Sequence, residues 1–264
     1  MLTQDSRGTR YELTGSGPAV VLVHGLGLNH AMWQWTAPQI AARYRVLSYD
    51  LLGHGASARP IGPYALQQFV DQLAALVEHV GLERFALIGF SLGGLISQAF
   101  TLAHPGRVRG LVVLHSAYDR SAAERAAIMQ RVHLAETAGP VATVDQALER
   151  WFTAAFAAQR PDVLAQVRAW VLANDRQAFA AAYHVLAQAD AELAERIGDI
   201  ACPALVITGS EDFGNSPDMA RRCARRMRQA ECSILPGLRH MALAERPEAV
   251  LALLLPFLDK TAGL

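Results

Sequence analysis

Short runs of apolar residues recur along the chain, and segments with helical spacing lie between them. The runs are 19–23, 46–49, 85–88, 111–114 and 204–208. They are nearly continuous rather than alternating in polarity, which is typical of parallel strands buried on both faces of a sheet. Between the second and third runs, apolar residues follow helical spacing from Leu66 to Val80, and Gly81 is a plausible helix end. The pattern predicts an α/β fold whose mostly parallel central sheet is flanked by helices.

The interval 119–199 breaks this alternation, because it contains no convincing strand pattern. It is rich in Ala, Leu, Glu, Gln and Arg, which favour helix, and Gly139-Pro140 and Arg160-Pro161 divide it. We therefore expect roughly four helices. Ligands of open α/β sheets bind beyond the carboxyl ends of the strands, and this interval follows such an end. We expect a helical cap (lid) at 119–199, inserted late in the sheet, over a core formed by 1–118 and 200–264; a separate small domain is the alternative.

Composition narrows the class of protein. The chain has 264 residues, of which 52% are hydrophobic, and its 24 Lys plus Arg balance its 24 Asp plus Glu. This balance gives no electrostatic reason to expect nucleic acid or an anionic membrane as a partner. The apolar stretch 249–258 is too short to span a bilayer, and residues 1–8 lack the apolar core of a signal peptide. Three cysteines without metal-ligand spacing indicate reduced thiols. We expect a soluble, cytoplasmic protein, with a homodimer left open.

The pentapeptide Gly89-Phe90-Ser91-Leu92-Gly93 lies where an apolar run changes into a helical pattern. A serine at such a junction, with glycine two residues to either side, has the form of a nucleophile elbow. Side chains at the two glycine positions would collide with the neighbouring strand and helix. The pattern predicts that the Ser91 hydroxyl projects alone from the strand end as a nucleophile.

A serine nucleophile needs a base, and the base needs an orienting acid. The run 204–208 leads into Gly209-Ser210-Glu211-Asp212, and a further strand pattern at 232–235 leads into a loop that contains His240. The order Ser91, Asp212, His240 predicts a catalytic triad on loops at one edge of the sheet. Glu211, the neighbour of Asp212, and Asp119, which follows the strand at 111–114, are the competing acids.

Acyl transfer also needs donors for an oxyanion. The strand at 19–23 ends in His24-Gly25-Leu26-Gly27, near the expected site. We expect the backbone N–H groups of Leu26 and Leu92 to form the oxyanion hole, the latter at a helix N-terminus. The sequence contains no dinucleotide fingerprint or P-loop, and its histidines lack metal-ligand spacing, so we expect no cofactor and no metal.

These motifs together resemble the α/β-hydrolase superfamily over nearly the whole chain. The shared elements are the His24-Gly25 turn, the 49–57 loop, the elbow at 89–93, Gly209-x-x-Asp212, and His240 followed by Glu245-Arg246-Pro247. More narrowly, the chain resembles 3-oxoadipate enol-lactonases and related hydrolases of aromatic-compound degradation. The narrower features are His30-Ala31-Met32-Trp33, Gly62-Pro63-Tyr64, Ser91-Leu92-Gly93-Gly94 and the 172–176 segment. Enol-lactonases of this group often have Asn-Ser where this chain has His24-Gly25.

The resemblance implies a serine hydrolase of a small, carboxylate-bearing ester, enol-lactone or activated amide, in aromatic or heteroaromatic catabolism. The alternatives are a carbon–carbon bond hydrolase of ring-fission products, a general carboxylesterase, or a small-molecule receptor on the same scaffold. As substrate-binding residues we expect Gly25, Trp151 and Tyr183. Cap arginines that could pair with a substrate carboxylate are Arg131, Arg150, Arg168 and Arg176. Other aromatic candidates are Trp33, Trp35, Phe152, Phe156 and Trp170.

Overall fold

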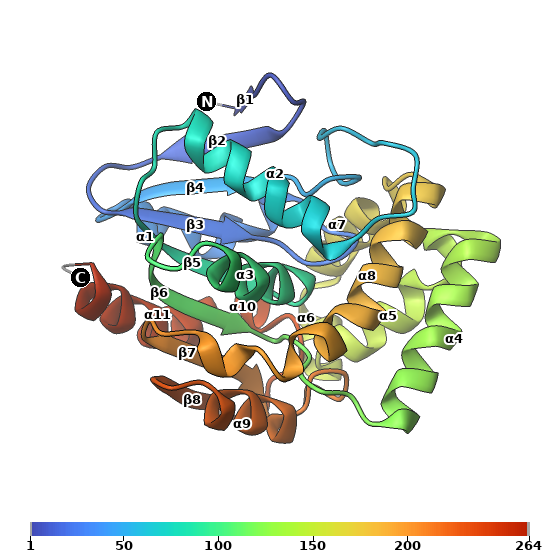
Figure 1. Ribbon diagram of the computed structural model, residues 1–264. Coiled ribbons are helices and arrows are strands. Elements are labelled where there is room, and N and C mark those ends of the chain that lie inside the picture. Colours follow the sequence, from blue (N-terminus) through green and yellow to red (C-terminus); the bar gives the residue numbers. More distant parts are fainter. Residues whose placement is uncertain (1, 263–264) are drawn as a thin grey trace.

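A twisted sheet of eight strands runs through the part of the chain that the computed structural model describes, residues 2–262 (Figure 1). The strands are β1 (Leu2–Gln4), β2 (Arg10–Thr14), β3 (Ala19–Val23), β4 (Arg45–Tyr49), β5 (Phe85–Phe90), β6 (Val108–Leu114), β7 (Ala204–Gly209) and β8 (Ala230–Leu235). Their order is β1-β2-β4-β3-β5-β6-β7-β8. Strands β3 to β8 are parallel to one another, and β1 and β2 add an antiparallel edge beside β4. The predicted α/β fold with a mostly parallel sheet is confirmed.

All six strands that the apolar runs predict are present, extended by up to three residues at an end. The antiparallel strands β1 and β2 were not predicted. In β2 only Tyr11 is buried, and its neighbours Arg10 and Glu12 face partly into solvent. This half-exposed strand, which lies between the edge strand β1 and β4, therefore lacks the continuous apolar run that identifies the central strands.

Helices cover both faces of the sheet. The core helices are α1 (Ala37–Ala41), α2 (Leu66–His79), α3 (Leu92–Ala103), α9 (Pro217–Arg226), α10 (Ala242–Glu245) and α11 (Pro247–Thr261). Helices α2, α3 and α9 lie on the face toward the viewer in Figure 1, with α1 and α11 behind the sheet. The amphipathic helix α2 buries Leu66, Phe69, Leu73 and Val77, as its spacing predicts.

The interval between β6 and β7 is helical. It contains α4 (Ala122–Ala138), α5 (Val144–Trp151), α6 (Ala154–Gln159), α7 (Pro161–Leu172) and α8 (Arg176–Ala194), five α-helices among the described residues rather than roughly four. The sequence pattern did not predict the break between α5 and α6. The Thr153 hydroxyl accepts a hydrogen bond from Phe156 N there and so caps the start of α6. These helices gather at the side of the sheet toward which β6 points, at the right in Figure 1.

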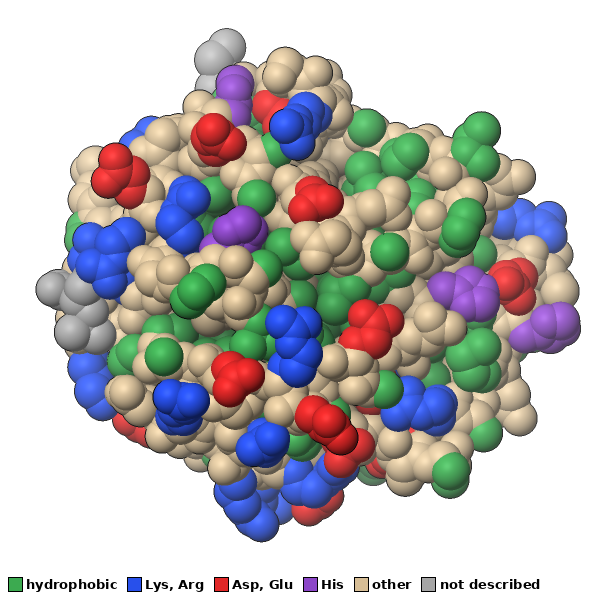
Figure 2. Space-filling view, in the orientation of Figure 1, with side chains coloured by type: hydrophobic (Ala, Val, Ile, Leu, Met, Phe, Trp, Pro, Cys, Tyr) green, Lys and Arg blue, Asp and Glu red, His purple; other side chains and the backbone are tan. Residues whose placement is uncertain are grey.

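The surface carries mixed charge. Figure 2 shows acidic and basic side chains interspersed over the face toward the viewer, as the zero net charge suggests. Within residues 2–262, no helix is both long enough and apolar enough to cross a membrane.

Candidate active site

Ser91 occupies a strained turn between β5 and α3. Its backbone has φ 54° and ψ −114°, a conformation that non-glycine residues rarely adopt. A side chain at Gly89 would overlap the carbonyl of Gly93, and a side chain at Gly93 would overlap the carbonyl of Val23. The two glycines therefore allow the tight turn, as the elbow pattern predicts.

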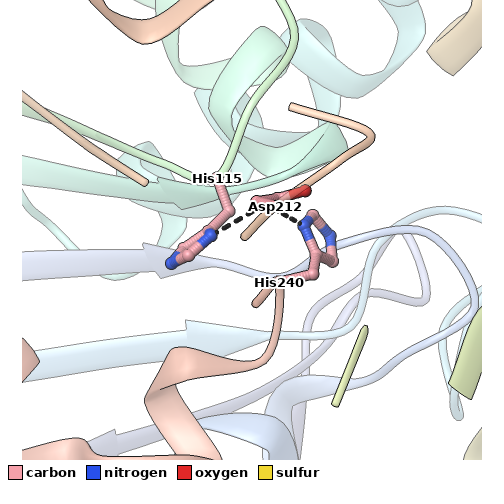
Figure 3. Close-up of side chains that lie close together, drawn as sticks. All are labelled: His115, Asp212 and His240. Carbon is pink, nitrogen blue, oxygen red and sulfur yellow. Dashed lines mark hydrogen bonds and ion pairs between the residues drawn. The ribbon is translucent and has the colours of Figure 1, made fainter. Parts of the chain in front are cut away.

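His240 and Asp212 meet at the carboxyl edge of the sheet. Asp212 follows β7 and His240 follows β8, and His240 Nδ1 lies 2.8 Å from Asp212 Oδ2 (Figure 3). The two residues are 4% and 3% exposed. Because an ionised carboxylate can only accept, the shared proton lies on Nδ1, and Nε2 of a neutral His240 is free to act as a base.

Several interactions keep the Asp212 carboxylate ionised. Burial alone would raise the pKa of Asp212, but the charge of His240 and the hydrogen bonds from His115 and His240 hold it well below its usual range. The second carboxylate oxygen, Oδ1, accepts hydrogen bonds from the backbone N–H groups of Gly214 (3.2 Å) and Asn215 (3.0 Å). An anionic, fixed acid is what a catalytic histidine requires.

His115 is a second histidine on the same acid, and no sequence motif predicted its role. It directly follows β6, and its Nδ1 lies 2.9 Å from Asp212 Oδ2 (Figure 3). The residue is 1% exposed and has φ 49°. Its position just after a strand end was the one signal in the sequence that could have identified it.

The cluster of His115, Asp212 and His240 is also the one set of described residues whose donor atoms could together hold a metal ion, since these atoms lie within 4.8 Å of one another. The spacing of histidines along the sequence did not predict this cluster, because its three residues lie far apart in the chain. Metal coordination requires histidine nitrogens without protons, whereas both Nδ1 atoms here lie at hydrogen-bond distance from the carboxylate. The arrangement fits two imidazole donors on one acceptor.

A cavity of about 70 Å³ connects these groups to the helical interval. The core contributes Ser91, Asp212 and His240 together with Leu26, Leu28, Phe90, Gly214 and Asn215. The interval 119–199 contributes Arg120, Ile128, Arg131, Arg150, Trp151, Tyr183 and Leu186. The predicted nucleophile, base and acid therefore open on one small space beneath the predicted cap.

Two unused backbone donors lie beside Ser91. Among the described residues, no acceptor takes the N–H of Leu26 or the N–H of Leu92. Leu92 is the first residue of α3, where free N–H groups and the helix dipole favour negative charge. Both groups are available for an oxyanion.

The side chain of His24 holds the turn that carries Leu26. This buried histidine donates from Nδ1 to the Gly25 carbonyl at 2.8 Å, and its Nε2 accepts from Leu51 N at 2.9 Å. Burial and the nearby His54 lower the pKa of His24 to about 3, so the ring stays neutral and can accept. The imidazole therefore holds the turn without adding charge to the cavity.

Gly25 and Trp151 both lie close to the cluster. A Cβ at Gly25 would lie 3.1 Å from the Cβ of Ser91, so a side chain at 25 would crowd the nucleophile. The Trp151 ring lies 5.8 Å from the His240 ring between centroids, and the Trp151 carbonyl accepts from Met241 N at 2.9 Å. Tyr183, on α8, lines the cavity as well. All three expected substrate-binding positions are thus at or beside the cavity.

Three arginines line the cavity, and they differ in pairing. Arg120, which the sequence analysis did not name, is buried and donates to Asp190 at 2.7 Å. Among the described residues, Arg131 and Arg150 have neither a side-chain hydrogen bond nor an ion pair. Burial and the charge of Arg131 lower the pKa of Arg150. Two guanidinium groups near each other without a counter-ion favour an anionic ligand.

Other candidates lie outside the cavity. Arg168 pairs with Asp145, and Arg176 donates to the Glu136 carbonyl. The competing acids are also elsewhere, since Glu211 lies 3.7 Å from Arg239 and Asp119 pairs with Arg222 at 3.1 Å. Among the remaining aromatics, Trp33 and Phe152 are buried in the core, Phe156 stacks on Phe152, and Trp35 packs against Trp170.

A serine on a tight strand-to-helix turn, in a sheet of this order, defines the hydrolase class of α/β enzymes. The family profile of the alpha/beta hydrolase fold matches residues 18–247, and the chain belongs to that family. It is 29% identical over 261 residues to an (E)-2-((N-methylformamido)methylene)succinate hydrolase of Acinetobacter baylyi, covering 97% of this chain and 96% of the relative. It is 30% identical over 195 residues to a 3-oxoadipate enol-lactonase of the same species, covering 74% and 72% of the two chains.

Solved structures agree with these relatives. The crystal structure of the enol-lactonase from Burkholderia xenovorans LB400 superposes with a TM-score of 0.88 at 30% identity, covering 96% of this chain and 97% of that one. The predicted resemblance to enol-lactonases within the α/β-hydrolase superfamily is confirmed.

Proposed function

We propose that the protein is a serine hydrolase that cleaves a small, carboxylate-bearing ester, enol-lactone or activated amide through an acyl-enzyme. The observation that carries the proposal is that Ser91 and His240 line one cavity, while His240 Nδ1 lies 2.8 Å from the buried Asp212 carboxylate. This geometry leaves His240 Nε2 as the base for the Ser91 hydroxyl.

The proposed reaction has two halves. Ser91 Oγ attacks the substrate carbonyl as its proton passes to His240 Nε2, and the leaving oxygen or nitrogen then takes that proton. Water next attacks the acyl-enzyme with His240 as base, which releases the acid and restores the hydroxyl. The free N–H groups of Leu26 and Leu92 would donate to the oxyanion in both halves.

The two unpaired guanidinium groups support a substrate that carries a carboxylate. Arg131 and Arg150 line the same cavity as Ser91, from helices α4 and α5 of the 119–199 interval. An arginine binds a carboxylate with charge-assisted hydrogen bonds, worth about 1.5–3 kcal/mol each. Both Acinetobacter relatives are named for dicarboxylate derivatives, a succinate and an oxoadipate, and so favour the same substrate class. We further propose a role in aromatic or heteroaromatic catabolism, which is what the resemblance of the sequence motifs implies.

Active-site labelling and a substrate panel test the proposal. A fluorophosphonate should label Ser91 in the wild type, and Ser91→Ala should fold normally, resist labelling and lose roughly 10³-fold or more of its turnover. The panel consists of a p-nitrophenyl ester with and without a carboxylate, an enol-lactone, and a vinylogous 1,5-diketone. Near-wild-type hydrolysis by a folded Ser91→Ala protein would refute the serine mechanism. Preference for the diketone would instead indicate a carbon–carbon hydrolase, and binding without turnover a receptor.

A further inference from the structure

The Asp212 carboxylate receives two histidine donors on a single oxygen. Oδ2 lies 2.8 Å from His240 Nδ1 and 2.9 Å from His115 Nδ1 (Figure 3). The two rings approach Asp212 from different strand ends and are 5.6 Å apart between centroids, nearly perpendicular to each other. One histidine suffices to complete a triad, so the second requires its own explanation.

The tautomer of His115 follows from its acceptor. An ionised carboxylate cannot donate, so His115 Nδ1 carries the proton. Its Nε2 points away from Asp212 in Figure 3, is buried, and has no hydrogen-bond partner among the described residues. Burial lowers the pKa of His115, which therefore stays neutral beside the acid. His115 supplies a hydrogen-bond donor to Asp212 and no charge.

We propose that His115 is a positioning residue for Asp212, which fixes Oδ2 and, by sharing this oxygen, limits the proton affinity of His240. The inference rests on the proposed hydrolase function. A carboxylate oxygen that accepts two N–H donors stabilises a protonated His240 less than one that accepts a single donor.

Few charged or titratable side chains act on His115. The charged and titratable side chains that act on it are Asp212, from the loop after β7, and His240, from the loop after β8. The Thr208 hydroxyl of β7 lies 3.4 Å from its Nδ1 and is uncharged, and the Phe90 ring of β5 packs at 5.8 Å between centroids. Its backbone has a positive φ of 49°, a conformation that non-glycine residues rarely adopt.

The matched variants are His115→Asn and His115→Leu. Their side chains have the same branched shape, but only Asn keeps an N–H near the position of Nδ1, and Asn also tolerates positive φ. The readout is the rate of Ser91 labelling by a fluorophosphonate as a function of pH, because its acid limb reports the protonation of His240. We expect the midpoint of this limb to rise by about one pH unit in His115→Leu and to stay within about 0.3 unit of wild type in His115→Asn.

If the wild type is labelled, two results would overturn this inference and leave the proposed function intact. One is an acid limb of the labelling profile that does not shift in His115→Leu. The other is an equal shift in both variants, since loss of the ring rather than of the N–H donor would then be the cause. A wild type that is not labelled at Ser91 would overturn the proposed function and this inference with it. Proton NMR of the wild type gives a second test that needs no variant to fold. Two strongly downfield Nδ1–H resonances are expected, from His115 and His240, and a single one would contradict the shared oxygen.

Discussion

Gly25 faces Ser91 so closely that a Cβ at position 25 would lie 3.1 Å from the Ser91 Cβ and 2.9 Å from the Phe90 ring. Gly25→Ala should therefore push the oxyanion turn away from the nucleophile by several tenths of an ångström. We expect kcat/KM to fall by roughly 10- to 100-fold, since small misplacements of catalytic groups are costly. Steady-state kinetics on a carboxylate-bearing p-nitrophenyl ester measure the loss.

Gly198→Ala is the control for this glycine substitution. The first atom that its methyl group would meet is the flexible end of Arg226, at 3.0 Å, and neither Gly198 nor Arg226 lines the cavity. Wild-type kinetics are expected for it. Equal kinetics for Gly25→Ala and Gly198→Ala would show that the turn at Gly25 does not control the reaction.

Asp212→Asn should lower kcat by roughly 10³- to 10⁴-fold, because the amide no longer fixes the base form of His240 and does not stabilise its cation. The matched control is Asp119→Asn, at the other acid that follows a strand. Asp119 pairs with Arg222 on the surface, so its variant should keep wild-type kcat. A large loss at Asp119 with little at Asp212 would reverse the assignment of the acid.

Much of the fold and of the reacting groups was predictable because both depend on local patterns. The central strands are apolar on both faces, and Ser91 directly follows one of them, β5. Asp212 lies in the loop after β7, and His240 lies in the loop after the edge strand β8. The strand end itself places each side chain at the same edge of the sheet. Strand β2 was missed for the opposite reason, since this half-exposed strand beside the edge strand β1 has polar residues on both sides of Tyr11.

The cavity wall could not be predicted in the same way. Arg131 and Arg168 are the same residue type, and both lie on helices of the 119–199 interval. Only Arg131 lines the cavity, whereas Arg168 pairs with Asp145 at the surface. The choice depends on how α4 and α7 are oriented over the sheet, which no local pattern encodes. His115 was missed because its partner Asp212 lies 97 residues away in the sequence.

The buried ion pair between Arg120 and Asp190 should stabilise the attachment of α8. Asp190 is 0% exposed and accepts from the Arg120 guanidinium at 2.7 Å and from Arg120 N at 2.8 Å. Asp190→Ala would leave a buried, uncompensated cation, so we expect the free energy of unfolding to fall by about 3–5 kcal/mol. Urea unfolding measures it. The exposed acid Asp162 is the control, and an equally large effect of Asp162→Ala would contradict the role of burial.

Stability should fall as the pH is lowered from 7 to 5, because two buried histidines are neutral in the fold. Burial lowers the pKa of His24 to about 3 and that of His54 to about 4, against 6.5 for an exposed histidine. The unfolded chain therefore binds protons below pH 6.5 that the folded chain does not, which destabilises the fold by about 2 kcal/mol per histidine at pH 5. Urea unfolding at both pH values tests this. Asp50, with a pKa of about 2, titrates below this window.

Replacing His54 separates this effect from general acid sensitivity. His54→Gln removes the titrating ring, so the loss of stability between pH 7 and pH 5 should shrink by about 2 kcal/mol. His133, whose side chain is exposed, is the matched control, and His133→Gln should leave the loss unchanged. The same pH dependence in His54→Gln as in the wild type would rule out His54 as a source.

Arg150→Gln and Arg131→Gln should change which substrates are hydrolysed well. For a p-nitrophenyl ester that carries a carboxylate, each variant should lower kcat/KM by roughly 10- to 100-fold, the value of one charge-assisted hydrogen bond. For the uncharged ester of similar size, kcat/KM should change little, because no anion faces the guanidinium. Arg168→Gln is the control, since Arg168 pairs with Asp145 and does not line the cavity. Equal losses on both esters would mean that the two arginines support the cavity wall rather than bind the substrate carboxylate.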